Sequence, residues 1–332
     1  MNRPHCDAVD YVQFLIAAQR TFTCTEAARC APPSETAPAH DAFTRLLQRQ
    51  PLDTAALWQE VRPLVRRRAG VLVLDDTTLD KPYMQPRGLV TYHWSGKHHR
   101  VVKGINLLTL LWTNGQRRLP CDFRVYDKPT GGETKNAHFR TMLEAAHARG
   151  LVPRYVLFDS WYASLANLKA VRQRRWHFLT RLKSNRLVTL TRGSRAVPIA
   201  DVTVPAAGRV VHLRGYGFVK VFRLVATDGD TEYWVTDDQP MTEEQRATLA
   251  QQGWGIEVYH RGLKQCCGVE RMQVRNQRAV RGHLVLALRA FVRLEVHRLR
   301  TGLSWYAAKA AIIRDAIRAY LAHPRYGLGA TA

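Results

Sequence analysis

The chain has 332 residues, of which 46% are hydrophobic, enough for one large domain with an insertion or for two to three smaller domains. Fifty Lys and Arg residues against 27 Asp and Glu residues give a formal net charge of +23, which indicates a polyanionic partner, most often nucleic acid. No apolar run is long enough to span a membrane, and the N-terminal stretch lacks a signal-like apolar core. We therefore expect a cytoplasmic protein that associates with nucleic acid and has no membrane partner.

The six cysteines do not follow a metal-binding or disulfide pattern. None belongs to a Cys-x-x-Cys pair, and Cys266 and Cys267 are adjacent. We expect free thiols in a reducing compartment.

The first 68 residues have a helical pattern. Amphipathic stretches at 10–19 and 42–50 flank a connection rich in helix breakers, and a longer helix is predicted over 52–68. Short helices with a polar turn are compatible with a helix-turn-helix DNA-binding unit and equally with a plain helical cap. We expect this segment to be a helical domain that helps to recognise DNA.

From residue 71 onward, strand and helix patterns interleave. Strands are predicted at 71–76, 100–113, 118–127, 154–159 and 177–183, and helices at 136–149 and 164–175. This alternation predicts an α/β fold with a mixed sheet flanked by helices.

Residues 185–240 lose the helical period and read as a β-rich insertion with glycine turns. Helical patterns return at 242–252 and 254–265 and continue into a long tail. The predicted organisation is a helical domain at 1–68, a core formed by 69–184 and 241–300, the insertion at 185–240 and a helical tail at 301–332.

Basic residues concentrate in two segments. Residues 160–200 contain nine Lys and Arg residues and no acid, and residues 257–300 contain ten against three glutamates. A solvated surface normally interleaves acids with bases, so these segments favour contact with phosphates. Lys183 and Arg186 lie in the first segment, and Arg261 and Lys264 lie in the second.

Three acidic positions interrupt these basic or apolar contexts. Asp75 and Asp76 end an apolar run, Asp159 ends the strand "VLFD", and Glu257 lies in a predicted helix. Acids at the ends of neighbouring strands point into the crevice where α/β proteins bind ligands. Because successive strand residues face opposite sides, Asp75 and Asp76 cannot share one role, and position alone does not choose between them.

The helix that contains Glu257 carries charges with helical spacing. Glu257, Arg261 and Lys264 stand at i, i+4 and i+7, on one side of a helix. Taken alone, this is an ordinary surface ion pair. Together with the strand-end acids, it supplies a third carboxylate and two cations for phosphates.

Carboxylate-only ligation suits Mg²⁺ or Mn²⁺. Two such ions about 3.5–4 Å apart activate an attacking hydroxyl and stabilise a leaving oxygen in phosphodiester chemistry. The basic flanks would attract the DNA phosphates that this chemistry needs.

These motifs together resemble the DDE transposases of bacterial insertion sequences, whose ribonuclease H-like core is interrupted by a β-rich insertion. The resemblance rests on "LDDTTLDK", "GGETKNAHF", "VLFDSWYAS", "FLTRLKSNR" and "IEVYHRGLKQ", and it covers roughly residues 70–300. It implies that Asp76, which precedes Thr77, is the first catalytic and metal-binding acid, with Asp75 as its substitute. Asp159 and Glu257 would complete the triad and hold two metal ions.

The same resemblance implies the DNA contacts. Lys264 matches the lysine seven residues after the family glutamate. A tyrosine and an arginine that commonly precede that glutamate are replaced here by Ala250 and Gly253, which leaves the DNA contact of that turn open.

Further candidates come from single residues. Lys135 and Asn136 in the "GGETKN" loop are placed to approach a phosphate, with a plain turn as the alternative. Trp161 and Trp234 could stack on an unpaired base, although core packing is the more frequent role for Trp234. Adjacent His98 and His99 lie in a basic loop and favour a DNA-facing or solvated position over zinc binding.

The sequence thus predicts a cut-and-paste DNA transposase that acts as a homodimer in a synaptic complex with terminal inverted repeats and target DNA. Two alternatives use the same features. One is a ribonuclease H-like nuclease that cuts without joining, and the other is a DNA-binding regulator whose acids are structural.

Overall fold

The computed structural model describes residues 5–51, 54–86, 88–95, 99–127, 132–226 and 229–324. The chain divides into two compact units. We call Met1–Leu52 with Arg261–Ala332 the helical unit, and Asp53–His260 the sheet unit. The first 68 residues, expected as one helical segment, are divided between the two. His98 lies outside the described residues, as does Lys97 before it.

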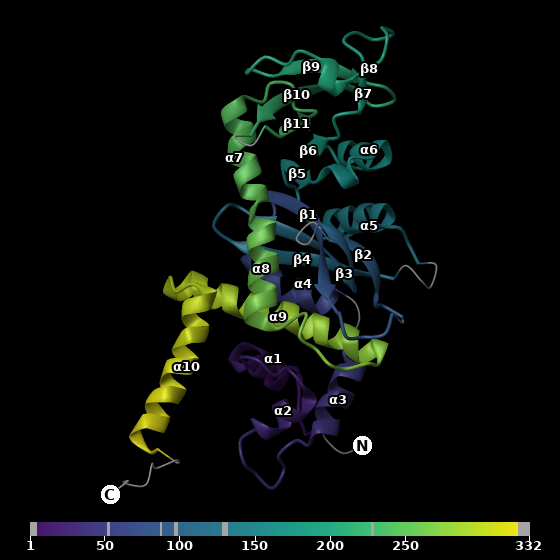
Figure 1. Ribbon diagram of the computed structural model, residues 1–332. Helices are drawn as coiled ribbons and strands as arrows, with labels where there is room; N and C mark the ends of the chain where they lie inside the picture. The colour runs from purple at the N-terminus through teal and green to yellow at the C-terminus, as the bar shows by residue number, and fades with distance from the viewer. Residues whose placement is uncertain are drawn as a thin grey trace, which may run out of the picture. The chain divides into compact units, whose positions relative to one another are not determined.

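A mixed sheet of nine strands organises the described part of the sheet unit (Figure 1). Its order is β2-β3-β1-β5-β6-β11-β10-β9, and β4 pairs with β3. β5 runs parallel to both β1 and β6, and the remaining pairs are antiparallel. The strands are β1 Val71–Asp80, β2 Thr91–Ser95, β3 Arg100–Thr113, β4 Arg118–Tyr126, β5 Tyr155–Phe158, β6 His177–Leu182, β9 Arg209–Leu213, β10 Gly217–Val225 and β11 Thr231–Thr236. The predicted α/β fold with a mixed sheet is confirmed.

β1 is longer than the sequence predicts. The strand continues past the acids to Asp80, because β3 pairs with it as far as Asp80–Gly104. Gly104 is required there, since a Cβ would stand 2.5 Å from the carbonyl oxygen of Leu79. The expectation that Asp75 and Asp76 end a strand is therefore wrong: they lie in its middle. Asp159 does follow directly after β5.

Helices pack on both faces of the sheet. α5, Lys135–Ala148, packs Phe139 against Phe158 of β5, with ring centroids 4.9 Å apart. α6, Leu165–Gln173, packs beside α5. On the opposite face α7, Glu243–Gly253, brings Gly253 against Leu157, the neighbour of Phe158. α8, Gly255–Cys267, follows α7 directly. α4, Ala55–Val61, precedes β1 and packs on β4.

The β-rich stretch extends the main sheet. β11 pairs with β6, so β9, β10 and β11 add to the edge of the core strands. A separate pair, β7 Leu187–Val188 and β8 Val197–Pro198, completes the stretch. Sequence patterning identifies these strands but does not show which edge they join.

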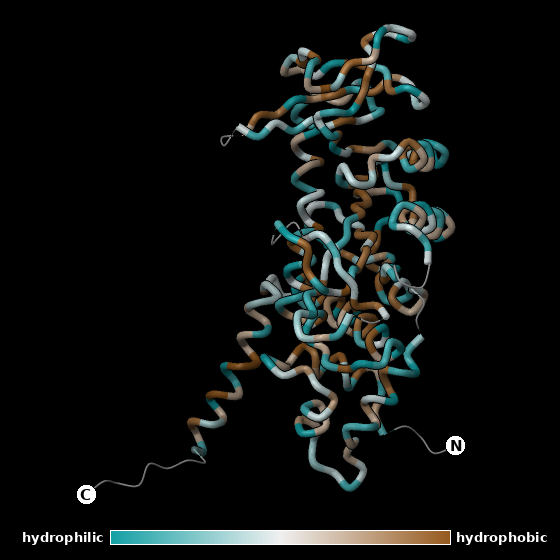
Figure 2. The backbone as a smooth tube through the Cα atoms, turned by 45° about the vertical axis from the view of Figure 1, so that its right-hand side comes forward, coloured by the Kyte–Doolittle hydropathy of each residue, from teal (hydrophilic) through white to brown (hydrophobic). Residues whose placement is uncertain are grey.

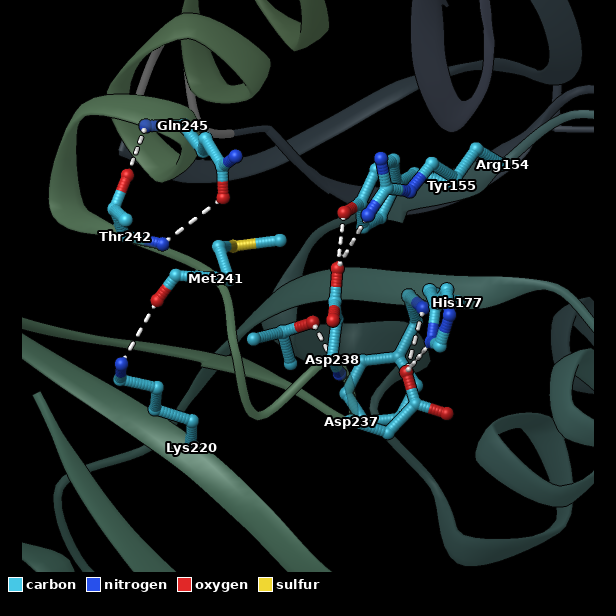
Figure 3. Close-up of polar contacts among 11 residues, drawn as sticks. Arg154, Tyr155, His177, Lys220, Asp237, Asp238, Met241, Thr242 and Gln245 are labelled. Carbon is cyan, nitrogen blue, oxygen red and sulfur yellow. Dashed lines mark hydrogen bonds and ion pairs between the residues drawn. The ribbon is translucent and has the colours of Figure 1, made fainter.

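Two aspartates after β11 hold this extension against the core strands (Figure 3). Asp237 accepts hydrogen bonds from the backbone nitrogen of Phe178 and from the hydroxyl of Tyr216, at 3.1 and 2.8 Å. Asp238 accepts from the hydroxyl of Tyr155 and from Arg154. Both acids are therefore structural.

The helical unit is built around α9. Its described helices are α1 Ala8–Ala17, α2 Cys24–Arg29, α3 His40–Arg49, α9 Gln277–Thr301 and α10 Trp305–Ala322. α2 lies within the connection that the sequence reads as breaker-rich. Gly282 allows α9 to contact α3 closely, because a Cβ there would stand 2.0 Å from the carbonyl oxygen of Leu47.

One buried lysine joins three segments of the helical unit. The ammonium of Lys309 donates to the carbonyl oxygens of Ile16, Ala18 and Cys266 at 2.9, 2.6 and 3.1 Å. Beyond this contact, α10 carries hydrophobic bands along an exposed helix (Figure 2), including Ile313 and Ile317. No helix among the described residues is both long and apolar enough to cross a membrane.

Candidate active site at the carboxylate cluster

Strand alternation separates the two acids of β1 onto opposite faces of the sheet. Leu74 pairs with Phe158, whose ring meets α5, so Asp76 two residues later lies on the α5 face. Asp75 lies on the other face, which α7 covers. The two acids therefore have different partners, as their adjacency predicts.

Asp76 is held by three donors. Its Oδ2 accepts from the ammonium of Lys135 at 2.7 Å and from Nδ2 of Asn106 at 2.6 Å, and its Oδ1 accepts from the hydroxyl of Tyr162 at 2.5 Å. Burial alone would raise the pKa of Asp76, but the charge of Lys135 and these hydrogen bonds bring the pKa below its ordinary value. Asp76 is therefore a pre-positioned, ionised carboxylate.

Asp75 is grouped with Glu257. Burial raises the pKa of Asp75 well above its ordinary value, and the negative charges of Asp76, Asp159 and Glu257 add to the effect. His260, one turn after Glu257 on α8, places Nδ1 3.9 Å from the Asp75 carboxylate. Asp75 thus lies within electrostatic range of Asp76, of Asp159 at the end of β5 and of Glu257 on α8.

Asp159 is the N-cap of a short 3₁₀ helix at Ser160–Tyr162. Its Oδ1 accepts from the backbone nitrogen of Trp161 at 3.0 Å. Burial, followed by the charge of Asp76, raises the pKa of Asp159. The two aromatic residues after Asp159 differ in burial. Tyr162 is buried and stacks on Phe139, with ring centroids 5.6 Å apart, whereas Trp161 is 60% exposed.

A cavity of about 520 Å³ opens beside Asp159 in the sheet unit. Its polar and aromatic wall includes Trp161, Ser164, Lys183, Asn185, Arg186 and Arg214. The Lys183–Arg186 turn is fixed by backbone hydrogen bonds from Arg186 to Lys183, from Ala200 to Ser184 and from Ile199 to Arg186. The cavity therefore has a preformed basic wall and one exposed indole.

The residues expected to contact DNA fall into three groups. Lys183, Arg186 and Trp161 line the cavity. Lys135 is engaged with Asp76, and its ammonium lies 5.9 Å from the Trp161 ring centroid. Arg261 and Lys264 lie on α8 within the helical unit, where Arg261 is exposed and Lys264 lies 3.5 Å from Glu270.

The remaining sequence candidates have structural partners. Asn136 accepts a hydrogen bond from Asn167 at 2.7 Å. Trp234 donates to Glu232 at 2.8 Å and lies between the guanidinium groups of Arg181 and Arg246. Both contacts are compatible with a structural role.

The donor set of the cluster suits a hard divalent cation. Its ligands are carboxylate oxygens. Burial, and after it mutual repulsion, raises the pKa of Asp75 and of Asp159, and a bound cation would offset both effects. Across the described residues, no three His, Cys, Asp or Glu side chains already converge as metal ligands. Metal binding at Asp76 would require the ammonium of Lys135, which now supplies the positive charge, to move away.

Sequence reasoning misses four residues of this site. Asn106 interrupts the apolar strand "INLLTLL", and Tyr162 follows Asp159 by three residues. His260 is three residues after Glu257, and Arg214 lies in a turn far along the chain. A polar residue inside an apolar strand is the one local signal that could have identified Asn106.

The fold is similar to that of a transposase of known structure. A structure of the piggyBac transposase synaptic complex with hairpin DNA matches with a TM-score of 0.56 and 12% identity, over 98% of this chain and 74% of that chain. The Drosophila P element transposase strand transfer complex has a TM-score of 0.19 and 8% identity, over 74% and 52% of the two chains. The Mos1 strand transfer complex has a TM-score of 0.21 and 10% identity, over 94% and 80%.

Comparison of the sequence with curated proteins gives no match. The family model for the transposase DDE domain matches residues 66–293, more than half of the 332 residues. The matched range contains all four acids of the cluster. The chain therefore belongs to the transposase DDE domain family and is a DNA transposase.

Proposed function

We propose that this transposase cuts DNA at both ends of a mobile element and joins the freed 3′-OH ends to target DNA. The observation that carries the proposal is the electrostatic grouping of acids from β1, the end of β5 and α8 in a chain of this family. Asp76, Asp159 and Glu257 would act as the catalytic carboxylates. Asp76 is favoured over Asp75 because it precedes Thr77, as in the family pattern, and because three donors hold its carboxylate in place.

The family generally uses divalent metal ions. We propose Mg²⁺ or Mn²⁺, two ions per site, held by Asp76, Asp159 and Glu257. When bound, such ions make a hydroxyl more nucleophilic and offset charge on the leaving oxygen.

The residues of the chain would orient this chemistry. Hydrogen bonds from Tyr162 and Asn106 fix the Asp76 carboxylate. A hydrogen bond from the backbone nitrogen of Trp161 fixes the Asp159 carboxylate. These hydrogen bonds hold each carboxylate in one orientation before DNA binds. Less conformational entropy is therefore lost when the site becomes ordered around DNA.

Basic residues beside the acids would hold DNA. Lys183 and Arg186 would contact phosphates, and Trp161 would contact a base or sugar at the mouth of the cavity. Arg261 and Lys264 follow Glu257 on α8 and would contact phosphates near the cut. The helices of residues 1–68 would assist in recognising terminal repeats.

Joining two ends requires two copies of the chain, so we expect a homodimer on paired-end DNA. A cleavage and strand-transfer assay with Mg²⁺ tests the function. Asp159→Asn and Glu257→Gln should lose at least about a hundredfold in both steps, since each removes a preorganised negative charge. Exposed acids of the same unit provide matched controls, Asp201→Asn and Glu244→Gln, which should retain activity.

Three results would contradict the proposal in different ways. Full activity of both acid variants would remove the catalytic role of the cluster. Cutting without joining by the wild-type protein would identify a nuclease. DNA binding with no cutting, unchanged in Asp159→Asn, would identify a DNA-binding regulator.

A further inference from the structure

The β2–β3 ribbon, defined as Thr91–Ser95 with Arg100–Gly104, has two unlike faces. One face packs inward: His93 is 7% exposed, and its ring centroid lies 6.2 Å from that of Tyr126. The opposite face presents Tyr92, Trp94 and Val101, which are 59%, 66% and 58% exposed. Trp94 pairs with Val101 and Tyr92 with Lys103, so these side chains form one contiguous patch.

The patch lies on the same face of the sheet as Asp75. Val101, Lys103 and Thr109 are separated by even numbers of residues on β3, and Thr109 pairs with Asp75. Lys103 and Val101 precede Thr109 by six and eight residues. At a rise of about 3.4 Å per residue, the patch lies about 20–27 Å along the strand from the acids.

The ribbon also extends beyond the strand ends at the site. Pairing of β1 with β5 stops at Leu74–Phe158, whereas β1 continues to Asp80 and β3 continues past it to pair with β2. A duplex that has a phosphate at the carboxylate cluster and an axis along β3 would run beside the ribbon.

Charge indicates what covers this patch. The ribbon itself carries two cations, Arg100 and Lys103, and no Asp or Glu. A second copy of the chain, with a net charge of +23, would bring the same basic patch against it, which charge repulsion disfavours. A DNA duplex is both complementary in charge and able to admit a two-stranded ribbon in its major groove.

We propose that the β2–β3 ribbon docks in the major groove of the DNA duplex that the active site cuts. Trp94 and Tyr92 contact the groove, and Lys103 on the same face contacts a phosphate. One base pair of B-DNA also advances about 3.4 Å, so contact is expected about six to eight base pairs from the cut. The position of this contact rests on the proposed function, because it is counted from the cleaved phosphate.

The first test is photo-crosslinking from residue 94. The full chain with benzoylphenylalanine at position 94 is bound to a duplex that carries one end of the element. The expected crosslink lies about six to eight base pairs from the mapped cleavage site. Crosslinks to a second protein chain, crosslinks more than about one helical turn from that range, or a yield no greater than from position 218 would overturn the proposal.

The second test needs no catalysis. Affinity for a duplex of about four helical turns is measured in EDTA over a range of salt concentrations. Lys103→Gln should lower the magnitude of the log–log salt slope by about 0.9, which is one phosphate contact. Trp94→Ala should weaken binding by about tenfold, or about 1.4 kcal/mol, with an unchanged slope.

Matched controls are Arg223→Gln and Phe218→Ala on β10, both exposed and in the same unit. Equal effects of ribbon and control variants would overturn the proposal. Because Trp94, Phe218 and Arg223 are exposed and Lys103 is half-buried, thermal unfolding should change little. If ribbon variants lose affinity while the wild-type protein never cuts DNA, the ribbon contact stands and the proposed function fails. If the wild-type protein cuts DNA and the ribbon variants bind DNA normally, the proposed function stands and the ribbon contact fails.

Discussion

The ammonium nitrogen of Lys135 lies 2.7 Å from Oδ2 of Asp76, inside the carboxylate cluster. Both side chains are 18% exposed, and the ring centroid of Tyr126 lies 5.6 Å from the same nitrogen. The contact fixes the first residue of α5 against the middle of β1. A phosphate contact by Lys135, as the sequence predicts, would therefore require Lys135 to leave Asp76.

Removing this ammonium should destabilise the metal-free protein. Lys135→Met leaves Asp76 mostly buried without its cationic partner, so the free energy of unfolding should fall by about 1.5–3 kcal/mol. Lys135→Arg keeps the charge and should lose less. Urea denaturation in EDTA at pH 7 measures both, and equal stability of Lys135→Met and wild type would show that the ion pair contributes nothing.

The two acids of β1 should not be equivalent. We expect Asp76→Asn to reduce cleavage at least about a hundredfold, because Asp76 precedes Thr77 as in the family pattern and three donors hold its carboxylate in place. Asp75→Asn should retain more activity than Asp76→Asn. Single-turnover cleavage of the two variants decides the question, and the opposite order would assign the role of the first catalytic acid to Asp75.

Divalent metal should stabilise the folded protein, because it binds the carboxylate cluster only when the cluster is assembled. Saturating Mg²⁺ or Mn²⁺ should raise the melting temperature by about 2–8 °C. Asp159→Asn should reduce this rise, and Asp201→Asn should leave it intact. Differential scanning calorimetry with and without EDTA measures the effect, and an equal rise in both variants would locate the metal elsewhere.

His138 should make stability depend on pH. Burial lowers the pKa of His138 below its ordinary value, although Glu133, 3.1 Å away, opposes the effect. Since the unfolded chain then takes up the proton more readily, the contribution of His138 is present above about pH 6.5 and is lost as pH falls toward the folded-state pKa.

The comparison variant is His138→Gln, which cannot titrate. Between about pH 7.5 and 5.5, the wild-type protein should lose stability relative to this variant by at most about 1.4 kcal/mol per pH unit. Urea midpoints across this range measure the difference. A difference that stays constant with pH would contradict the assignment.

The aspartate anchor after β11 should depend on Tyr155. Tyr155 is 6% exposed and donates its hydroxyl to Asp238, so Tyr155→Phe leaves this acid short of a donor. We expect a loss of about 1–3 kcal/mol. Arg154, whose side chain is 68% exposed, reaches the same carboxylate, and Arg154→Ala should cost less than about 1 kcal/mol. If Arg154→Ala lowers the free energy of unfolding more than Tyr155→Phe does, Arg154 and not Tyr155 is the main partner of Asp238.

Much of the sheet unit is readable in the sequence because its elements have strong local patterns. The period of "NAHFRTMLEAAHARG" predicts α5, and the apolar run "YVLF" predicts β5. β2 escapes such reading because its five residues alternate a buried histidine with exposed aromatics. The domain limits predicted at residues 68, 184, 240 and 300 stay a prediction.

The sequence by itself determined which residues are candidates for catalysis. The chain is basic, and the acids at 75–76, 159 and 257 stand out against their basic or apolar surroundings. Local patterns suffice for this, because charge and periodicity are properties of neighbours in the chain. Only the tertiary structure decided what each acid faces. The register of β1 with β3 and β5 places Asp76 against Lys135, Tyr162 and Asn106, and Asp75 toward Glu257. Strand register joins residues that are 30 to 86 positions apart, and no local pattern encodes that pairing.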